Sequence, residues 1–119
     1  MLPTPADVAR AAERVAADSN VPIVLREAAV RSALREAEHL VTDDVDVPAA
    51  LHFTFTRHRD VFSRDASRVL AVILHDVASR VGIKILASDA ELHARLAHPP
   101  ESVEDARDWF AGRVVMYGG

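Results

Sequence analysis

The chain contains no cysteine among its 119 residues. Disulfide bonds, thiolate metal sites and cysteine nucleophiles are therefore excluded, and the composition fits a reducing compartment. Long apolar runs are also missing, since none reaches the roughly 18 to 20 residues that a membrane span requires. Met1 to Pro5 does not show the basic and then apolar pattern of a secretory signal. We therefore expect a cytoplasmic protein that does not enter a membrane.

Glycine and aromatic residues are scarce, with 4 glycines and 5% aromatic residues. Abundant alanine, leucine, glutamate and arginine favour helices over sheets. Positive charge is in deficit, because 14 Lys and Arg face 18 Asp and Glu, which makes the net charge −4. An acidic chain is a poor general nucleic-acid binder, since neutralising phosphates dominates that affinity. We predict one all-α domain over residues 1–119, without a nucleic-acid partner.

Capping residues mark where several helices begin, because a hydroxyl before the first turn accepts a free backbone N–H. Three such pairs are Thr4 with Asp7, Ser88 with Glu91 and Ser102 with Asp105. Prolines and glycines supply the remaining boundaries. The expected helices are residues 5–18, 22 or 23–40, 48–59, about 65–81, 88–98 and 102–112, with 83–86 as a short apolar connection and 114–119 as a loosely held tail.

The helix expected at about 65–81 is apolar around most of its circumference. Val69, Ile73 and Val77 follow the helical period, while Leu70 and Leu74 widen the apolar arc. Such a helix belongs in the middle of a bundle. We therefore predict a bundle of about six helices around this central buried helix, ended by Gly82 in a left-handed cap.

Residues 51–56 are ambiguous between a helix and a strand. Their alternating pattern and β-forming residues favour a strand. A lone strand in a helical chain has no partner for its edges, unless residues 114–117 form a small hairpin with it. We predict the helix, with Leu51 and Phe55 facing inward.

The expected second helix carries alternating charges on its exposed side. Glu27 and Arg31 have the spacing of an i,i+4 ion pair. Arg31 and Arg35 beside Glu36 and Glu38 indicate a solvated helix face.

Six histidines do not make a metal site in this sequence. None belongs to an H-E-x-x-H motif, and His93 and His98 are five residues apart, on different faces of a helix. The acidic run at residues 43–46 lacks the glycine and terminal glutamate of a calcium loop. We predict no bound metal.

The densest basic patch comes just before the central helix and into its first turn. Its members are Arg57, His58, Arg59, Arg64 and Arg68, partly offset by Asp60 and Asp65. One interpretation is a solvated loop with local ion pairs. The other is an anion or nucleotide site, because a helix N-terminus with free amides and an early arginine attracts negative charge.

The stretch Asp60-Val61-Phe62-Ser63-Arg64-Asp65-Ala66-Ser67-Arg68 resembles the motif of the Fic/Doc family, H-P-F-x-D-G-N-K-R. The similarity is closest to the death-on-curing (Doc) toxins. Phe62 falls on the motif phenylalanine, Arg68 on its arginine and Gly82 on the glycine that ends the family's central helix. Residues 83–92, Trp109 and, more weakly, Ser32-Ala33-Leu34 extend the likeness over most of residues 23–112. The resemblance implies a Fic/Doc-like helical fold.

The motif departs from the family at its catalytic positions. Asp60 stands where the family has the histidine that accepts the proton, and Arg64 where it has the magnesium-binding acid. Asp65, Ala66 and Ser67 replace the glycine, asparagine and lysine of the phosphate-binding turn. The resemblance leaves Phe62 as a buried anchor and Arg68 as a phosphate contact. Arg64 with Arg68 would make a metal-free anion clamp that includes Ser67, and the loss of the acid argues against magnesium.

Three functions follow as alternatives. The first is a Fic/Doc-like domain with a degenerate motif, related to toxin–antitoxin systems or regulation, which binds an ATP-like nucleotide, a phosphate or a protein partner. The second is an active transferase that phosphorylates or nucleotidylates a hydroxyl on a target protein, such as a translation factor. It would use Asp60 or His58 as base, although a carboxylate needs burial to act near neutral pH. The third is a helical interaction module that binds a small protein such as an antitoxin.

Overall fold

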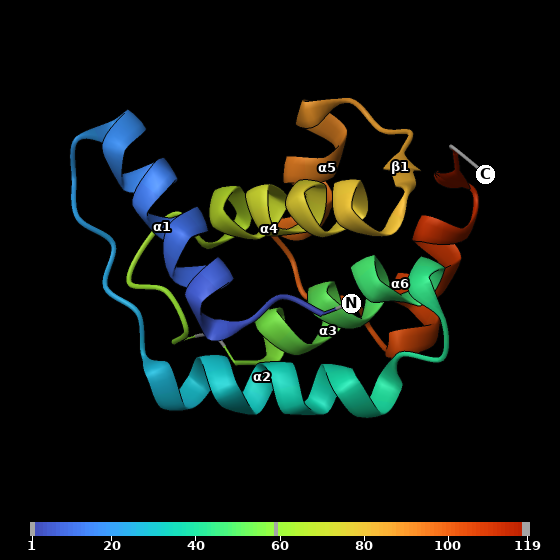
Figure 1. Ribbon diagram of the computed structural model, residues 1–119, viewed down its shortest axis with the longest axis horizontal. Coiled ribbons are helices and arrows are strands. Elements are labelled where there is room, and N and C mark those ends of the chain that lie inside the picture. Colours follow the sequence, from blue (N-terminus) through green and yellow to red (C-terminus); the bar gives the residue numbers. More distant parts are fainter. Residues whose placement is uncertain (1, 59, 118–119) are drawn as a thin grey trace.

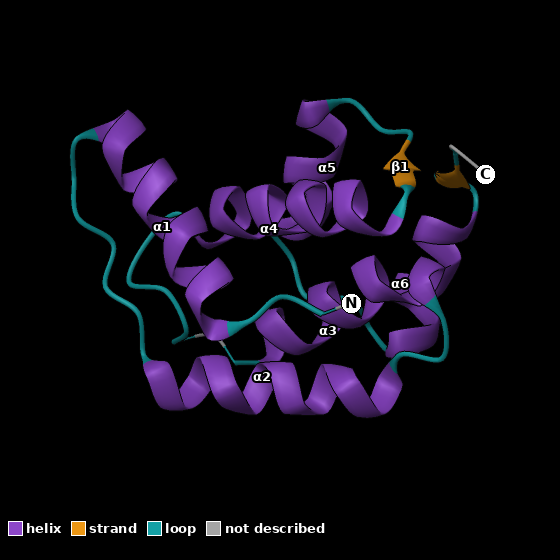
Figure 2. Ribbon diagram, viewed as in Figure 1, coloured by secondary structure: helices purple, strands orange, loops and turns teal. Residues whose placement is uncertain are grey.

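The structure is a computed structural model that describes residues 2–58 and 60–117. Within these residues six α-helices fold into one bundle with a short two-stranded sheet at one end, which confirms the all-α expectation (Figure 2). The elements are α1 Pro5–Ser19, α2 Glu27–Leu40, the 3₁₀ turn η1 Asp44–Asp46, α3 Val47–Arg57, α4 Ala66–Val81, β1 Ile83–Ile85, α5 Asp89–Leu96, α6 Val103–Ala111 and β2 Val114–Met116.

Helix α4 lies at the centre of the bundle, as its apolar circumference predicts. Figure 1 shows α1, α3 and α5 around it, and each of these helices contacts it. Its residues Val69, Ile73, Leu74 and Val77 are buried. Gly82 ends the helix with a φ of 74°, the left-handed conformation expected there.

The three capping pairs form as predicted. The side chain of Thr4 accepts from the backbone N of Asp7, that of Ser88 from Glu91 and that of Ser102 from Asp105. The helices that these residues begin are therefore placed correctly by local hydrogen bonding alone.

Residues 51–56 form part of helix α3, as predicted, and the alternative hairpin with residues 114–117 is wrong. Leu51 and Phe55 are buried, and so are His52 and Thr54 between them. Because α3 is covered on most sides, its β-forming residues pack into the core as a helix. The predicted end at Arg59 falls on a residue outside the described ranges, and the helix ends at Arg57.

Helix α2 begins at Glu27, so the predicted start at Pro22 or Ile23 is wrong. Residues 24–26 are extended and pair with residues 61–63, through the bridge between Leu25 and Phe62. Ser63 donates its backbone N–H to the Val24 carbonyl at 3.0 Å and accepts the Val24 N–H on its hydroxyl at 2.8 Å. These long-range bonds compete with the first helical turn and replace it.

Residues 114–117 are held by hydrogen bonds, so the predicted loose tail is wrong for these residues. Val114 to Met116 pair antiparallel with Ile83 to Ile85, so the predicted apolar connection is strand β1. Ile83 and Ile85 are buried while Lys84 is exposed, and Tyr117 donates its backbone N–H to the Gly82 carbonyl at 3.0 Å. The alternation of β1 lets its two isoleucines join the core.

No helix in the described part of the chain has the length and apolar character to cross a bilayer.

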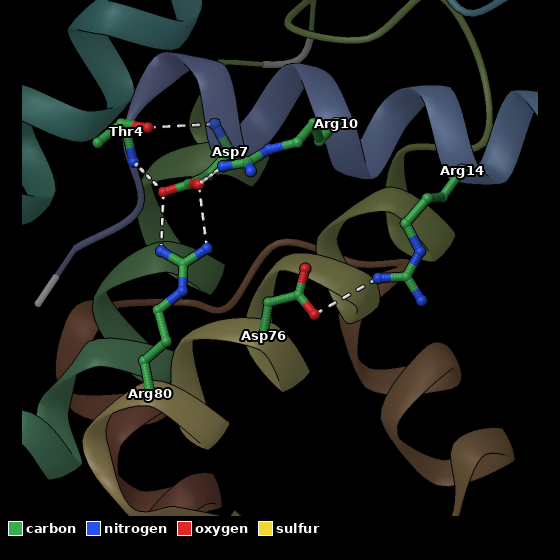
Figure 3. A network of polar contacts seen from close by, with 6 residues as sticks. All are labelled: Thr4, Asp7, Arg10, Arg14, Asp76 and Arg80. Carbon is green, nitrogen blue, oxygen red and sulfur yellow. Dashed lines mark hydrogen bonds and ion pairs between the residues drawn. The ribbon is translucent and has the colours of Figure 1, made fainter.

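An ion pair joins the first turn of α1 to the last turn of α4. Both oxygens of Asp7 accept from Arg80, at 2.8 and 3.0 Å, and Asp7 also accepts from the backbone N–H of Thr4 at 2.9 Å. Figure 3 shows Asp7 between these two partners, with Arg14 and Asp76 forming a second contact along the same helices at 3.5 Å. The hydrogen bonds from Arg80, and next that from Thr4, hold the pKa of Asp7 well below its usual range.

Because of Asp7, we expect the stability of the fold to decrease as the pH falls through the acid range. Because its pKa is lower in the folded than in the unfolded chain, its contribution is complete above the unfolded value of about 3.9. That contribution is lost as the pH falls below it toward the folded pKa. We expect Asp7→Asn to lower the melting temperature at pH 7 and to reduce the loss of stability between pH 5 and pH 2, followed by circular dichroism. Glu13→Gln, an exposed change on the same helix, is the control; equal pH profiles for wild type and Asp7→Asn would contradict the assignment.

Candidate functional site

The turn that begins α4 leaves its first amides without a side-chain cap. Asp65 is the N-cap residue and has a φ of 53°, a left-handed conformation that aspartate tolerates better than most residues. Its side chain makes no capping hydrogen bond within the described residues. The N–H groups of Ala66, Ser67 and Arg68 are therefore the part of the helix where a bound anion gains most from the helix dipole.

A hollow of about 450 Å³ opens beside this turn. Phe55 and Phe62 stack at one side of it, with ring centroids 6.1 Å apart. Phe62 is buried, as the anchor role implied by the motif requires. The other lining residues come from the start of α4, the end of α5 and the segment that follows it: Asp65, Ala66, Ser67, Leu70, Leu96, Ala97 and Pro99, together with Thr56 of α3.

Ser67 lines this hollow and contacts a residue that lines a second one. Its hydroxyl lies 2.9 Å from Nε2 of His93. His93 and Arg68 both line the second hollow, of about 510 Å³, together with His75 and Asp89. Ser67 is thus in contact with His93, and Arg68 lines the same hollow as His93. Because one member of the Ser67–His93 pair donates to the other, the pair offers an anion one further donor.

The predicted pairing of Arg64 with Arg68 in one clamp is not formed. Arg64 donates from Nε to the carboxylate of Asp65 at 3.1 Å, and it lines neither hollow. The charge of Arg64 is therefore already balanced by its neighbour, while Arg68 has no carboxylate within 4.0 Å among the described residues. Of the predicted anion-binding residues, Ser67 lines the first hollow and Arg68 lines the second.

Asp60 lies outside both hollows and is 77% exposed. Its carboxylate pairs with Arg26 of the extended segment before α2, at 3.0 Å. A carboxylate serves as a general base near neutral pH when burial disfavours its charge, and this one has both solvent and a cationic partner. The geometry does not support Asp60 as a base.

Two other residues of the basic patch contact helix α2. His58 and Arg57 both contact the carboxylate of Glu36, the latter at 3.3 Å. His58 is half-buried in this contact, and it lines neither hollow. Arg59 lies outside the described residues. The patch seen in the sequence therefore separates into a structural cluster on α2 and a smaller group at α4.

Two further histidines take different places. His52 is fully buried under Phe110, and its Nε2 lies 2.9 Å from the His98 carbonyl. Burial lowers the pKa of His52 to about 4, so the ring is neutral and part of the core at neutral pH. His75 is exposed. No group of three His, Cys, Asp or Glu residues within the described ranges has the geometry to hold a metal ion.

Sequence reasoning missed His93, which it considered only as a metal ligand and gave no role. The capping box at Ser88 fixes where α5 begins and which face of that helix carries His93. No local signal states that this face packs beside the first turn of α4. That contact arises only from the packing of α5 on α4.

Comparisons with protein-family models, with curated proteins and with solved structures find no match for this chain. The likeness to the Fic/Doc family consequently remains a hypothesis based on the residues of the motif and their spacing.

The left-handed turn at Asp65 is testable with two substitutions at one position. Asp65→Ala and Asp65→Gly both remove the pair with Arg64, but only alanine is strained at a positive φ. We expect the alanine variant to be less stable than the glycine variant by about 1 kcal/mol. Urea unfolding measures both free energies. Equal stabilities would show that residue 65 does not hold this conformation.

Proposed function

We propose that the chain is a Fic/Doc-like domain that binds a phosphate-bearing ligand at the beginning of α4 and lacks the family's transfer reaction. The observation that carries the proposal is the uncapped first turn of α4, where Ser67 lines the apolar hollow and contacts His93, and where Arg68 and His93 line the second hollow. The sequence and spacing of Phe62, Arg68 and Gly82 support it independently.

The proposed phosphate site has donors of three kinds. The first-turn amides of α4 offer N–H groups along the helix dipole. Arg68 supplies a full charge without a carboxylate partner in the described residues, and a charge-assisted hydrogen bond from it is about twice as strong as a neutral one. The hydrogen-bonded pair of Ser67 and His93 adds one further donor beside the same turn, because the other donor is used between them.

An ATP-like nucleotide fits this arrangement better than a free phosphate does. The hollow next to Ser67 has stacked aromatic rings and aliphatic side chains in its wall, surfaces that suit a base or sugar. The carboxylate that lines this hollow belongs to Asp65. Its negative charge is balanced by the hydrogen bond from Arg64, which reduces its repulsion of a bound anion. Because Arg64 replaces the acid that holds magnesium in the family, we propose binding without the metal.

Transfer of the phosphate or nucleotide by the family mechanism is not part of the proposal. Asp60 is exposed and paired with Arg26, and neither Asp60 nor His58 lines a hollow at the beginning of α4. Ala66 lacks the amide side chain that the family places in the turn. An interaction with an antitoxin or another small protein, in a cytoplasmic toxin–antitoxin or regulatory setting, is the role that the resemblance implies for such a domain.

Calorimetric titration with ATP, ADP and inorganic pyrophosphate tests the proposal. We expect at least one of them to bind to the wild-type protein, and Arg68→Ala to weaken that binding about 10- to 100-fold, because one charge-assisted bond contributes about 1.5–3 kcal/mol. Lys84→Ala removes an equal charge from strand β1 and should leave the affinity within about twofold. The proposal fails if none of the three ligands binds, or if Arg68→Ala binds as tightly as wild type.

A further inference from the structure

The hydroxyl of Ser67 has a partner of a kind that no other serine in the described part of the chain has. Its oxygen lies 2.9 Å from Nε2 of His93, a histidine of a different helix. The other serine hydroxyls with hydrogen-bond partners contact backbone groups and, in one case, a glutamate: Ser19, Ser63, Ser88 and Ser102. A serine hydroxyl next to an imidazole is the pair of groups that nucleophilic catalysis uses.

The contact has the geometry of a nucleophile and its base. A hydroxyl that lies about 2.6–3.2 Å from an unprotonated ring nitrogen can pass its proton to that nitrogen. In the tautomer with the ring proton on Nδ1, the Ser67 hydroxyl donates to Nε2 of His93. An imidazole accepts a proton near neutral pH. Ser67 is half-buried and His93 is exposed, so a substrate has access to both side chains.

The hollow beside Ser67 suits an apolar acyl group. Its volume is about 450 Å³, and its walls include Phe55, Phe62, Leu70 and Leu96. An aliphatic or aromatic acyl chain can bury its surface against such side chains with its carbonyl carbon at the Ser67 hydroxyl. The hollow therefore favours a substrate whose acyl part is apolar.

The first turn of α4 holds donors for a negative carbonyl oxygen next to the same hydroxyl. Ser67 is the second residue of the helix, and Val69 is the first whose backbone N–H bonds to the N-cap carbonyl, that of Asp65, at 3.0 Å. The N–H groups of Ser67 and Arg68 therefore have no earlier carbonyl of the helix to bond. The N–H of a nucleophile and that of the residue after it are common members of an oxyanion hole.

We propose that Ser67 and His93 form a catalytic dyad that hydrolyses carboxylic esters with an apolar acyl group. Oγ of Ser67 bonds to the carbonyl carbon and its proton moves to Nε2 of His93. The bond from that carbon to the alcohol oxygen then breaks, and His93 gives the proton to this oxygen. In the second step water adds to the acyl carbon and gives a proton to His93, which returns it to Oγ as the carboxylic acid leaves. This chemistry uses no nucleotide, so it goes beyond the proposed phosphate binding.

The dyad has no third group to orient the imidazole. No carboxylate lies within 4.0 Å of His93 in the described ranges, since the two histidines with such a contact are His58 and His75. Loss of the acid from a catalytic triad lowers turnover about 10⁴-fold. We therefore expect slow turnover, and covalent labelling of Ser67 is a more sensitive readout than steady-state hydrolysis.

The test measures labelling of the whole protein by an alkyl fluorophosphonate, in which a serine oxygen displaces fluoride from phosphorus. We expect mass spectrometry to find the label on Ser67 and to find none on Ser67→Ala. His93→Gln should slow labelling about 100-fold, because a positioned base contributes about 10²–10⁴-fold. Ser79→Ala, at an exposed position on the same helix, and His39→Gln, at an exposed position on α2, should react like wild type. Thermal melts establish that all variants are folded.

The absence of cysteine permits a second measurement that does not depend on turnover. Ser67→Cys introduces a single thiol beside His93, and its alkylation by iodoacetamide should be about 10-fold faster than that of Ser79→Cys. A helix N-terminus also activates a thiol. Adding His93→Gln to Ser67→Cys separates the two effects, and the rate should then fall.

Four results would each overturn the proposal: no labelling of wild type, equal labelling of Ser67→Ala, equal rates for wild type and His93→Gln, or a thiol at position 67 whose alkylation does not depend on His93. The phosphate site is tested independently by the titration of Arg68→Ala. Nucleotide binding without labelling would overturn the dyad alone, and labelling without nucleotide binding would overturn the phosphate site alone.

Discussion

Burial of α4 is the constraint on which the rest of the structure depends. A helix that is apolar on most sides is stable in water only when other elements cover it, and burying each large aliphatic side chain contributes about 1.5–3 kcal/mol. Helix α1 covers one side and is held in place by the two hydrogen bonds between Asp7 and Arg80. α3, α5 and β1 cover the others. Once these contacts are made, the first turn of α4 has a fixed position between α3 and α5.

The position of that turn decides which charges gather there. Asp65 takes a left-handed conformation, and its carboxylate accepts a hydrogen bond from Arg64. The charge of Arg64 is therefore balanced by Asp65. Asp60 pairs with Arg26 of the extended segment before α2 and does not line the hollow beside the turn. What stays at the turn is Arg68 with Ser67 and, from α5, His93. Neither Asp60 nor His58 lines the hollow beside this turn, and the proposal is therefore one of anion binding without transfer.

Local hydrogen bonding explains what could be predicted from the sequence. The caps at Thr4, Ser88 and Ser102 and the left-handed Gly82 depend on residues within one turn, so they fix helix ends without tertiary information. The start of α2 and strand β2 depend on partners far along the chain, at residues 61–63 and 83–85. The candidate site divides in the same way. Ser67 and Arg68 are visible in the motif, whereas the contact of His93 with Ser67 and the pairing of Asp60 with Arg26 follow from packing.

The central claim is that a phosphate group binds at the first turn of α4. The most direct measurement is the set of backbone amide NMR shifts during a titration with inorganic pyrophosphate at neutral pH. We predict large, saturable shifts for Ala66, Ser67 and Arg68, because their N–H groups would donate to the anion. Shifts confined to the arginines of α2, or no saturable shift at residues 66–68, would contradict the claim.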